Sequence, residues 1–167
     1  PYRVLYHDIE TLGTNPEDAA IIQWSLVFDM GNDVVEKHIV AVGSVAPMEH
    51  VHVHSVPTEA ELLYTGRKLF IEKDPDIVVA YNGVNFDNKF LSVRAGGEAG
   101  GDEQVYVSFR HLKAFFHLSR FAMRATKLRE LSLSYPGMGG DNKYKIFEMD
   151  GRINMDFFVY FKAEERE

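Results

Sequence analysis

Val4-Leu5-Tyr6-His7-Asp8-Ile9-Glu10-Thr11 is the stretch around which the rest of the chain is organised. Its first three residues are apolar and favour β-structure, which predicts a short buried strand. Side chains alternate along a strand, so Asp8 and Glu10 should point to the same face. When two carboxylates lie this near each other, each makes the ionisation of the other more costly unless a cation lies between them. Hard oxygen ligands in this arrangement predict a Mg²⁺ or Mn²⁺ site.

The acidic pair is not specific by itself, because a solvated surface pair is an equally simple interpretation. The chain has other acidic pairs at this spacing, among them Glu59/Glu61, Asp74/Asp76, Glu148/Asp150 and Glu165/Glu167. A second signal lies at Tyr81-Asn82-Gly83-Val84-Asn85-Phe86-Asp87. The apolar run Ile77 to Ala80 before it predicts a central strand parallel to the first. Asp87 then lies at a strand-to-helix junction, on the sheet edge where α/β proteins bind ligands.

The amino-acid composition restricts the classes of protein to which the chain can belong. The chain has 167 residues, 46% of them hydrophobic and 26% charged, which predicts one globular domain with a proper core. No apolar run approaches the length of a membrane span, and no signal-peptide pattern is present. Cysteine is absent, so neither a disulfide framework nor a thiolate zinc site can form. A net charge of −7 argues against a general nucleic-acid coat protein.

Charge is spread unevenly along the chain. Between Gln104 and Arg129 there is no acidic residue, although six basic residues occur in that stretch. This stretch is either a basic solvent-exposed face or a contact surface for a phosphate backbone. In the second interpretation, Arg120 and Arg124 are candidate contacts to that phosphate backbone.

The remaining pattern predicts a mixed α/β domain. Ile21 to Phe28 and Val34 to Val42 should form strands that continue the first one as an antiparallel meander, with a turn at Gly31-Asn32. Thr58 and Glu61 form a capping-box pattern, which starts an amphipathic helix that ends before Asp74-Pro75. Further expected elements are a helix from Asp87 to Ala95, partial helix in Phe109 to Met123, a hairpin of Lys145 to Met149 with Arg152 to Met155, and a helix beginning near Asp156.

Three histidines alternate with valines in His50-Val51-His52-Val53-His54. A metal site made by these three imidazoles is one interpretation, but along one strand they would spread over roughly 13 Å, too far to share an ion. We therefore expect an exposed edge strand or loop here. His7, next to the acidic pair, should face away from Glu10, and we interpret it as a tolerated neighbour rather than a general base. Trp24 lies in an apolar strand and is expected in the core.

Three blocks resemble one known family. Asp8-Ile9-Glu10-Thr11 is similar to the first exonuclease motif of family B DNA polymerases, and Asp74-Pro75-Asp76-Ile77 with the segment from Tyr81 to Asp87 is similar to the second. Gly151-Arg152-Ile153-Asn154-Met155-Asp156 resembles the Gly-Arg-x-x-x-Asp block that follows. Order and spacing agree across nearly the whole chain. The segments after Ser134 most resemble the delta-type enzymes of eukaryotes and large DNA viruses.

The resemblance implies a ribonuclease H-like mixed sheet flanked by helices and a 3′–5′ proofreading exonuclease. In that family four carboxylates hold two divalent cations, Mg²⁺ or Mn²⁺. Asp8, Glu10 and Asp87 match three of these carboxylates. The fourth belongs to a Tyr-x-x-x-Asp motif that is not matched, because Tyr160 is followed by Glu164; we expect it, and the polymerase domain, beyond Glu167. The chain, 1–167, would thus be a partial exonuclease domain.

The same resemblance assigns further residues. Thr11, Asn82, Asn85 and Phe86 would line the approach of the substrate, although Phe86 is also explained as a core residue. Asp156 is either an additional ligand or, as the family block and capping chemistry favour, the N-cap of a helix.

Alternatives to a polymerase exonuclease domain are a stand-alone DNA or RNA exonuclease of the same fold and a non-catalytic module for DNA binding or assembly. The expected partners are the single-stranded 3′ end of a primer-template and the rest of a polymerase chain, together with a sliding clamp and accessory subunits. No membrane is expected as a partner. The expected location is intracellular, in the nucleus or at a viral replication site.

Overall fold

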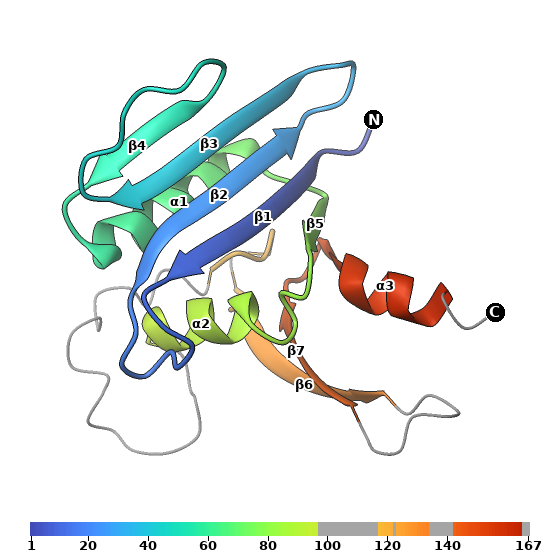
Figure 1. The fold of residues 1–167 in the computed structure, drawn as a ribbon. Coiled ribbons are helices and arrows are strands. Elements are labelled where there is room, and N and C mark those ends of the chain that lie inside the picture. The colour runs from blue at the N-terminus through green and yellow to red at the C-terminus, as the bar shows by residue number, and fades with distance from the viewer. Residues whose placement is uncertain (97–116, 122, 134–141, 165–167) are drawn as a thin grey trace.

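The computed structural model describes residues 1–96, 117–121, 123–133 and 142–164. Its centre is a mixed sheet of six strands in the order β4-β3-β2-β1-β5-β8 (Figure 1). These strands are β1 (Val4–Thr11), β2 (Ile21–Asp29), β3 (Val35–Val42), β4 (His52–Val56), β5 (Ile77–Ala80) and β8 (Ile153–Asp156).

The strand directions confirm the predicted meander. β1, β2 and β3 are antiparallel neighbours, and the turn between β2 and β3 uses left-handed backbone at Gly31 (φ 76°) and Asn32 (φ 54°). β5 runs parallel to β1, as the apolar run predicted. β4 is parallel to β3 at one edge, and β8 is parallel to β5 at the other. The acidic strand β1 therefore lies in the interior of the sheet.

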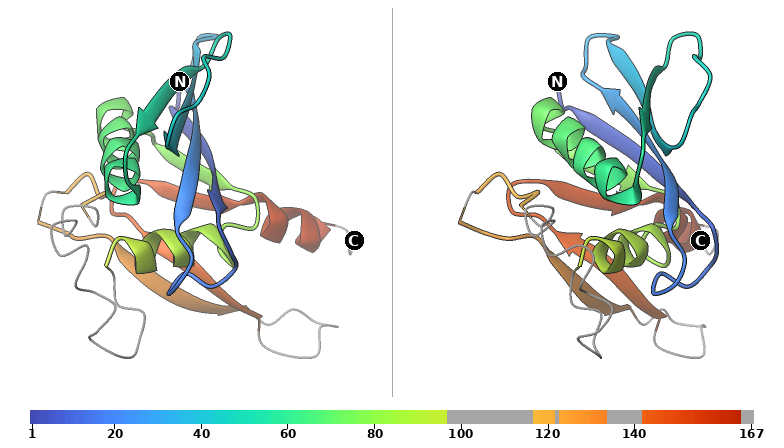
Figure 2. Two further views of the ribbon diagram at one scale, coloured as in Figure 1. Left: turned by 60° about the vertical axis from the view of Figure 1, so that its left-hand side comes forward. Right: turned by 90° about the vertical axis from the view of Figure 1, so that its left-hand side faces the viewer.

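In the described part of the chain, three helices accompany the sheet: α1 (Glu59–Lys73), α2 (Asp87–Arg94) and α3 (Phe157–Glu164). The predicted cap of α1 is present, because the Thr58 hydroxyl accepts a hydrogen bond from the Glu61 amide at 3.3 Å. α1 packs against β2, β3 and β4 and covers one face of that part of the sheet (Figure 2). Among the described helices, none is both long and apolar enough to cross a membrane.

One hydrophobic cluster joins the sheet to the helices. Trp24 is 2% exposed, as expected for a core residue, and Gly66 of α1 lies directly against it. A Cβ atom at Gly66 would come within 2.2 Å of the indole, so this helix position requires glycine. The cluster also holds Leu5 and Ile9 of β1, Phe70 of α1, and Phe90 and Leu91 of α2. The strand that carries the acidic pair is thus anchored through its opposite face.

The predicted hairpin around Asp150-Gly151 is wrong. β7 (Asn142–Glu148) pairs antiparallel with β6 (Lys127–Leu133), a strand that the sequence did not reveal, and β8 joins β5 instead. The amide of Ile153 donates to the carbonyl of Asp76 at 2.9 Å, and the nearly buried Arg152 side chain donates to Asp74 at 2.7 Å. These long-range contacts hold β8 against the start of β5, which a local pairing rule cannot foresee.

The predicted partial helix from 109 to 123 is not found where it can be checked. Residues 117–121 and 123 contain bends and a turn but no helix. Residues 109–116 and 122 lie outside the described residues. The helix expected near Asp156 is present as α3.

Candidate active site

The face of β1 that carries the acidic pair is open. Asp8 and Glu10 are both exposed, whereas Leu5 and Ile9 are buried on the other side of the strand. The alternation therefore places both carboxylates on one face, as predicted. A hollow of about 240 Å³ opens beside Asp8, lined by Tyr6, Tyr81 and Phe157 among others. This hollow was not foreseen from the sequence, because its lining comes from three separate strands and a helix start.

Asp87 is brought to this strand from the first turn of α2. It is only 3% exposed, and its Oδ1 accepts a hydrogen bond from the backbone amide of Ile9 at 3.0 Å. Ile9 is the residue between Asp8 and Glu10, so the contact fixes Asp87 beside the acidic pair. The two partners are 78 positions apart in the sequence. The parallel pairing of β1 and β5, followed directly by α2, produces this proximity.

The electrostatics of the site are those of concentrated like charge. Burial, followed by the charge of Asp8, raises the pKa of Asp87 to about 6, although hydrogen bonds from backbone amides act against this shift. Burial and then the charge of Glu10 raise the pKa of Asp8. A cation would relieve both penalties. The donor set of carboxylate oxygens suits a hard divalent ion, so the three residues fit such a group.

The three carboxylates do not converge as the ligands of a single ion would. A single ion needs three ligand atoms within about 4.8 Å of one another. Among the described residues, that condition is met elsewhere, by Glu36, His38 and His52. A two-ion site tolerates a wider spread, since ions about 4 Å apart place some of their ligands roughly 8 Å from one another. The arrangement of Asp8, Glu10 and Asp87 is therefore compatible with two ions.

Three of the predicted substrate-lining residues, Asn82, Asn85 and Phe86, lie in the turn between β5 and α2, and the fourth, Thr11, ends β1. Asn82 has a left-handed backbone (φ 62°), and its side-chain oxygen accepts from Asn85 at 2.6 Å. Phe86 is partly buried against the core and its ring lies 4.7 Å from that of Phe90, which confirms its packing role. The Thr11 hydroxyl donates to the Gly13 carbonyl at 2.6 Å. Substrate contacts of Thr11, Asn82, Asn85 and Phe86 stay predictions.

Asp156 confirms the capping interpretation and has a further role. Its Oδ1 accepts from the amides of Phe158 and Val159 at the start of α3. The same carboxylate accepts from the amides of Asn82 (3.1 Å) and Val84 (3.0 Å). Asp156 therefore ties the turn that precedes Asp87 to the end of β8. The sequence indicated the cap but not this second set of partners.

His7 lies next to the site in sequence, and its Nδ1 is buried without a hydrogen-bond partner in the described structure. Burial lowers the pKa of His7 to about 4, against a smaller opposing effect of Asp156. The imidazole is thus neutral at physiological pH, and strand alternation directs it away from Asp8 and Glu10. These properties agree with a neighbour of the site rather than a base in it.

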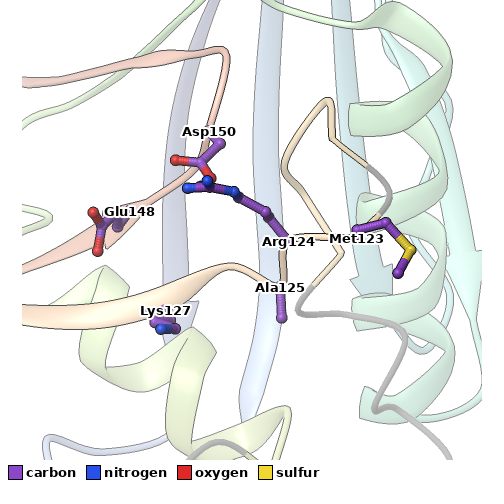
Figure 3. Close-up of a pocket in the computed structure, with 6 residues that line it drawn as sticks. All are labelled: Met123, Arg124, Ala125, Lys127, Glu148 and Asp150. Atoms are coloured by element: carbon purple, nitrogen blue, oxygen red, sulfur yellow. The ribbon is translucent and has the colours of Figure 1, made fainter.

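The two arginines proposed to contact DNA differ in their surroundings. Arg120 donates to the carboxylates of Asp74 (2.9 Å) and Asp76 (2.6 Å) and to two carbonyls, so its donors are engaged within the protein. Arg124 is 72% exposed and pairs with Asp150 at 3.1 Å. A cavity of about 300 Å³ lies there, lined by Met123, Arg124, Ala125, Lys127, Glu148 and Asp150 (Figure 3). DNA contacts stay predictions, and these surroundings favour Arg124.

The fold and site together define an α/β protein whose parallel strands β1 and β5 end at an acidic edge suited to divalent cations. The predicted fold class, a mixed sheet flanked by helices, is thereby confirmed. The chain belongs to a family described as DNA polymerase family B, exonuclease domain, which matches residues 1–166. Exonuclease domains of this family use divalent metals.

Similar curated proteins are polymerase subunits. The chain is 30% identical over 99% of its length to the DNA polymerase delta catalytic subunit of Dictyostelium discoideum, and 38% identical over 78% to that of Arabidopsis thaliana. It is 37% identical over 70% of its length to the DNA polymerase catalytic subunit of Rat cytomegalovirus. The chain spans only 14%, 12% and 11%, respectively, of these relatives. The predicted resemblance to family B is confirmed.

Proposed function

We propose that this chain is a 3′–5′ proofreading exonuclease domain that hydrolyses the 3′-terminal phosphodiester of DNA. The observation that carries the proposal is the hydrogen bond from the Ile9 amide to Asp87, which fixes a third carboxylate beside Asp8 and Glu10. Membership of the family B exonuclease domains supports it. A non-catalytic module would have no reason to retain repelling charges on an open face.

In this proposal the cofactors are two divalent cations, Mg²⁺ or Mn²⁺. When bound, such cations activate a water for attack on phosphorus and stabilise the leaving 3′ oxygen. Asp8, which lines the hollow between β1 and β5, would contact both ions, and Glu10 would hold the one nearer the attacking water. Asp87 would support the second ion through water, because one of its oxygens already accepts from Ile9.

The family's fourth carboxylate is not matched after Asp156, since Tyr160 is followed by Glu164 at the fourth position. The proposal therefore assigns catalytic roles only to Asp8, Glu10 and Asp87. Thr11, Asn82 and Asn85 would position the substrate, and Arg124 would contact its backbone.

The proposed substrate is the single-stranded 3′ end of a primer-template. The rest of a polymerase chain, a sliding clamp and accessory subunits are proposed partners through parts of the protein outside these residues. The proposed place of action is intracellular, at DNA replication in the nucleus or at a viral replication site. These proposals rest on the names of the relatives, of which the chain spans a small part.

The test is cleavage of a 5′-labelled single-stranded oligonucleotide with Mn²⁺, compared among wild type, Asp8→Ala and Asp87→Ala. Stepwise shortening from the 3′ end that either substitution and EDTA abolish is expected. Glu61→Ala is the matched control, because it removes an acidic residue from α1, away from the site. Cation binding is followed separately as an increase in Tm with Mn²⁺ that Asp8→Ala diminishes.

Equal cleavage by wild type and Asp8→Ala would contradict the assignment. If this chain shows no cleavage, the same comparison is made in the full-length polypeptide that contains it. Absence of Asp8-dependent shortening there, despite Mn²⁺ binding, would favour a non-catalytic module.

A further inference from the structure

A second group of potential metal ligands lies at the opposite side of the sheet from β8. Glu36 and His38 are on β3, and His52 is on the neighbouring edge strand β4. His38 and His52 are direct partners in the parallel pairing of these strands. The ligand atoms of the three side chains all lie within 4.8 Å of one another. None of these residues belongs to the acidic site on β1.

The separations within the group suit one ion. Nε2 of His38 lies 3.4 Å from Oε2 of Glu36, which is long for a hydrogen bond. Two ligands that bind a tetrahedral Zn²⁺ at about 2.0–2.1 Å must lie roughly 3.3 Å apart. The His52 ring is stacked on that of His38, with centroids 4.7 Å apart, and it is exposed, so it can turn toward an ion that arrives from solvent.

The central imidazole is already oriented. His38 is 6% exposed, and its ring packs edge-on against Phe28 with centroids 5.7 Å apart. Its other nitrogen, Nδ1, lies 3.1 Å from Nε2 of His54. A hydrogen bond from the second ring nitrogen is the usual device that orients a metal-binding histidine. His54 thus has the position of an orienting partner rather than of a ligand.

We propose that Glu36, His38 and His52 bind one Zn²⁺ ion, which links the edge strand β4 to β3. Two imidazoles and one carboxylate form a donor set typical of Zn²⁺ sites and unlike the all-oxygen set of the acidic site. The edge strand expected from the histidine run is confirmed, as β4 (His52–Val56). Of the three histidines in the run from His50 to His54, only His52 is a ligand in this proposal.

One contact opposes the ion. Nζ of Lys73, at the end of α1, lies 2.6 Å from Oε2 of Glu36. The ammonium group and Zn²⁺ compete for this carboxylate, so the affinity of the wild type reflects that competition. Removal of the ammonium in Lys73→Gln should therefore tighten Zn²⁺ binding.

The test uses Asp8→Ala as background, with excess Mg²⁺, so that Zn²⁺ binding at the acidic site is suppressed. Calorimetric titration of the untagged chain with Zn²⁺ should show one equivalent bound, and Co²⁺ should give the visible absorption of a tetrahedral site. His52→Ala should weaken binding by at least about 10–100-fold, which is the loss typical of removing even a residue that only orients a ligand. His50→Ala is the matched control, because His50 is 85% exposed, pairs with the equally exposed Glu49 and does not belong to the group of Glu36, His38 and His52.

Because His38 is buried, His38→Ala can unfold the protein, so the decision rests on the exposed His52 and on Lys73. Zn²⁺ binding that is equal in His52→Ala and His50→Ala, or no binding above the Mg²⁺ background, would overturn the proposal. So would a Lys73→Gln variant with weaker Zn²⁺ binding. These readouts do not involve cleavage, so the outcome is independent of the proposed nuclease function.

Discussion

At the scale of single residues, the carboxyl group of Asp87 shows how the site opposes the stability of the fold. Its pKa is raised to about 6, mainly by burial and then by Asp8, whereas the same group in an unfolded chain titrates near 3.8. Ionisation is therefore less favourable in the folded state. The stability of the protein should fall as pH rises from about 4 to about 6 and should remain lower above that range.

Asp87→Asn removes this penalty while keeping an oxygen that can accept from Ile9. Without divalent cations, the variant should be more stable than wild type by about 2 kcal/mol at pH 7.5, with almost no difference at pH 4. Urea unfolding in EDTA at the two pH values measures this. A variant that is less stable at both would show that Asp87 is retained for structure.

Asp156 belongs to the same scale, since one carboxylate accepts four backbone amides. Asp156→Ala removes an N-cap and leaves amides of the β5–α2 turn without a partner, so it should cost about 3 kcal/mol. It should also slow cleavage, because that turn precedes Asp87. Asp156→Asn should recover part of the stability, and the exposed Glu17→Ala serves as control. Unchanged urea midpoints in Asp156→Ala would refute this role.

At the scale of elements, α1 depends on close contact between Gly66 and Trp24. Gly→Ala in a helix normally stabilises by about 1 kcal/mol. Here the added Cβ would lie 2.2 Å from the indole, so Gly66→Ala should instead destabilise the protein by about 2–3 kcal/mol. The measurement is chemical unfolding followed by the fluorescence of this single tryptophan. Trp24→Leu should restore part of the stability that Gly66→Ala loses; because the tryptophan is then absent, unfolding is followed by circular dichroism. If the losses of stability from the two substitutions simply add, the contact would be contradicted.

Some helices and strands could be predicted from the sequence, and others could not. β1, β2, β3, β5 and the caps of α1 and α3 follow from local patterns: alternation, apolar runs and capping residues. The acidic pair could be placed on one face for the same reason. β6 was missed and β8 was given the wrong partner, because their pairing depends on contacts between distant segments. The Asp87–Ile9 hydrogen bond and the Glu36–His38–His52 group likewise need strands brought together by the fold.

At the scale of the whole molecule, one ionic network joins segments from both ends of the chain. Asp74, just after α1, accepts from Arg3 (2.7 Å), Arg120 (2.9 Å) and Arg152 (2.7 Å). Asp76, at the start of β5, pairs with Arg120 at 2.6 Å and accepts from the amide of Arg3. The network therefore connects the beginning of β1, the end of α1, the segment at 120 and the start of β8. It gives Arg120 a structural role whether or not DNA binds nearby.

This network predicts how the fold responds to acid. Burial alone would raise the pKa of Asp74, but hydrogen bonds and charges from Arg120 and Arg152 outweigh it and lower the pKa to about 2. A carboxylate whose folded pKa is depressed contributes stability above about pH 4, and this contribution is lost as pH falls through about 2. Since Asp74 is about one-third exposed, solvent screening limits the contribution to about 1 kcal/mol.

Asp74→Asn should therefore be less stable than wild type at pH 7, by more than the screened charge alone, because Arg152 is 2% exposed and loses its ionic partner. Its stability should change less than that of wild type between pH 4 and pH 2. Urea unfolding across this range provides both values. Glu72→Gln, which removes an exposed pair with Lys68, is the control and should follow wild type. If the free energy of unfolding changed equally with pH in wild type and Asp74→Asn, acid would be acting on other carboxylates. The network would then hold the segments together by hydrogen-bond geometry rather than by charge.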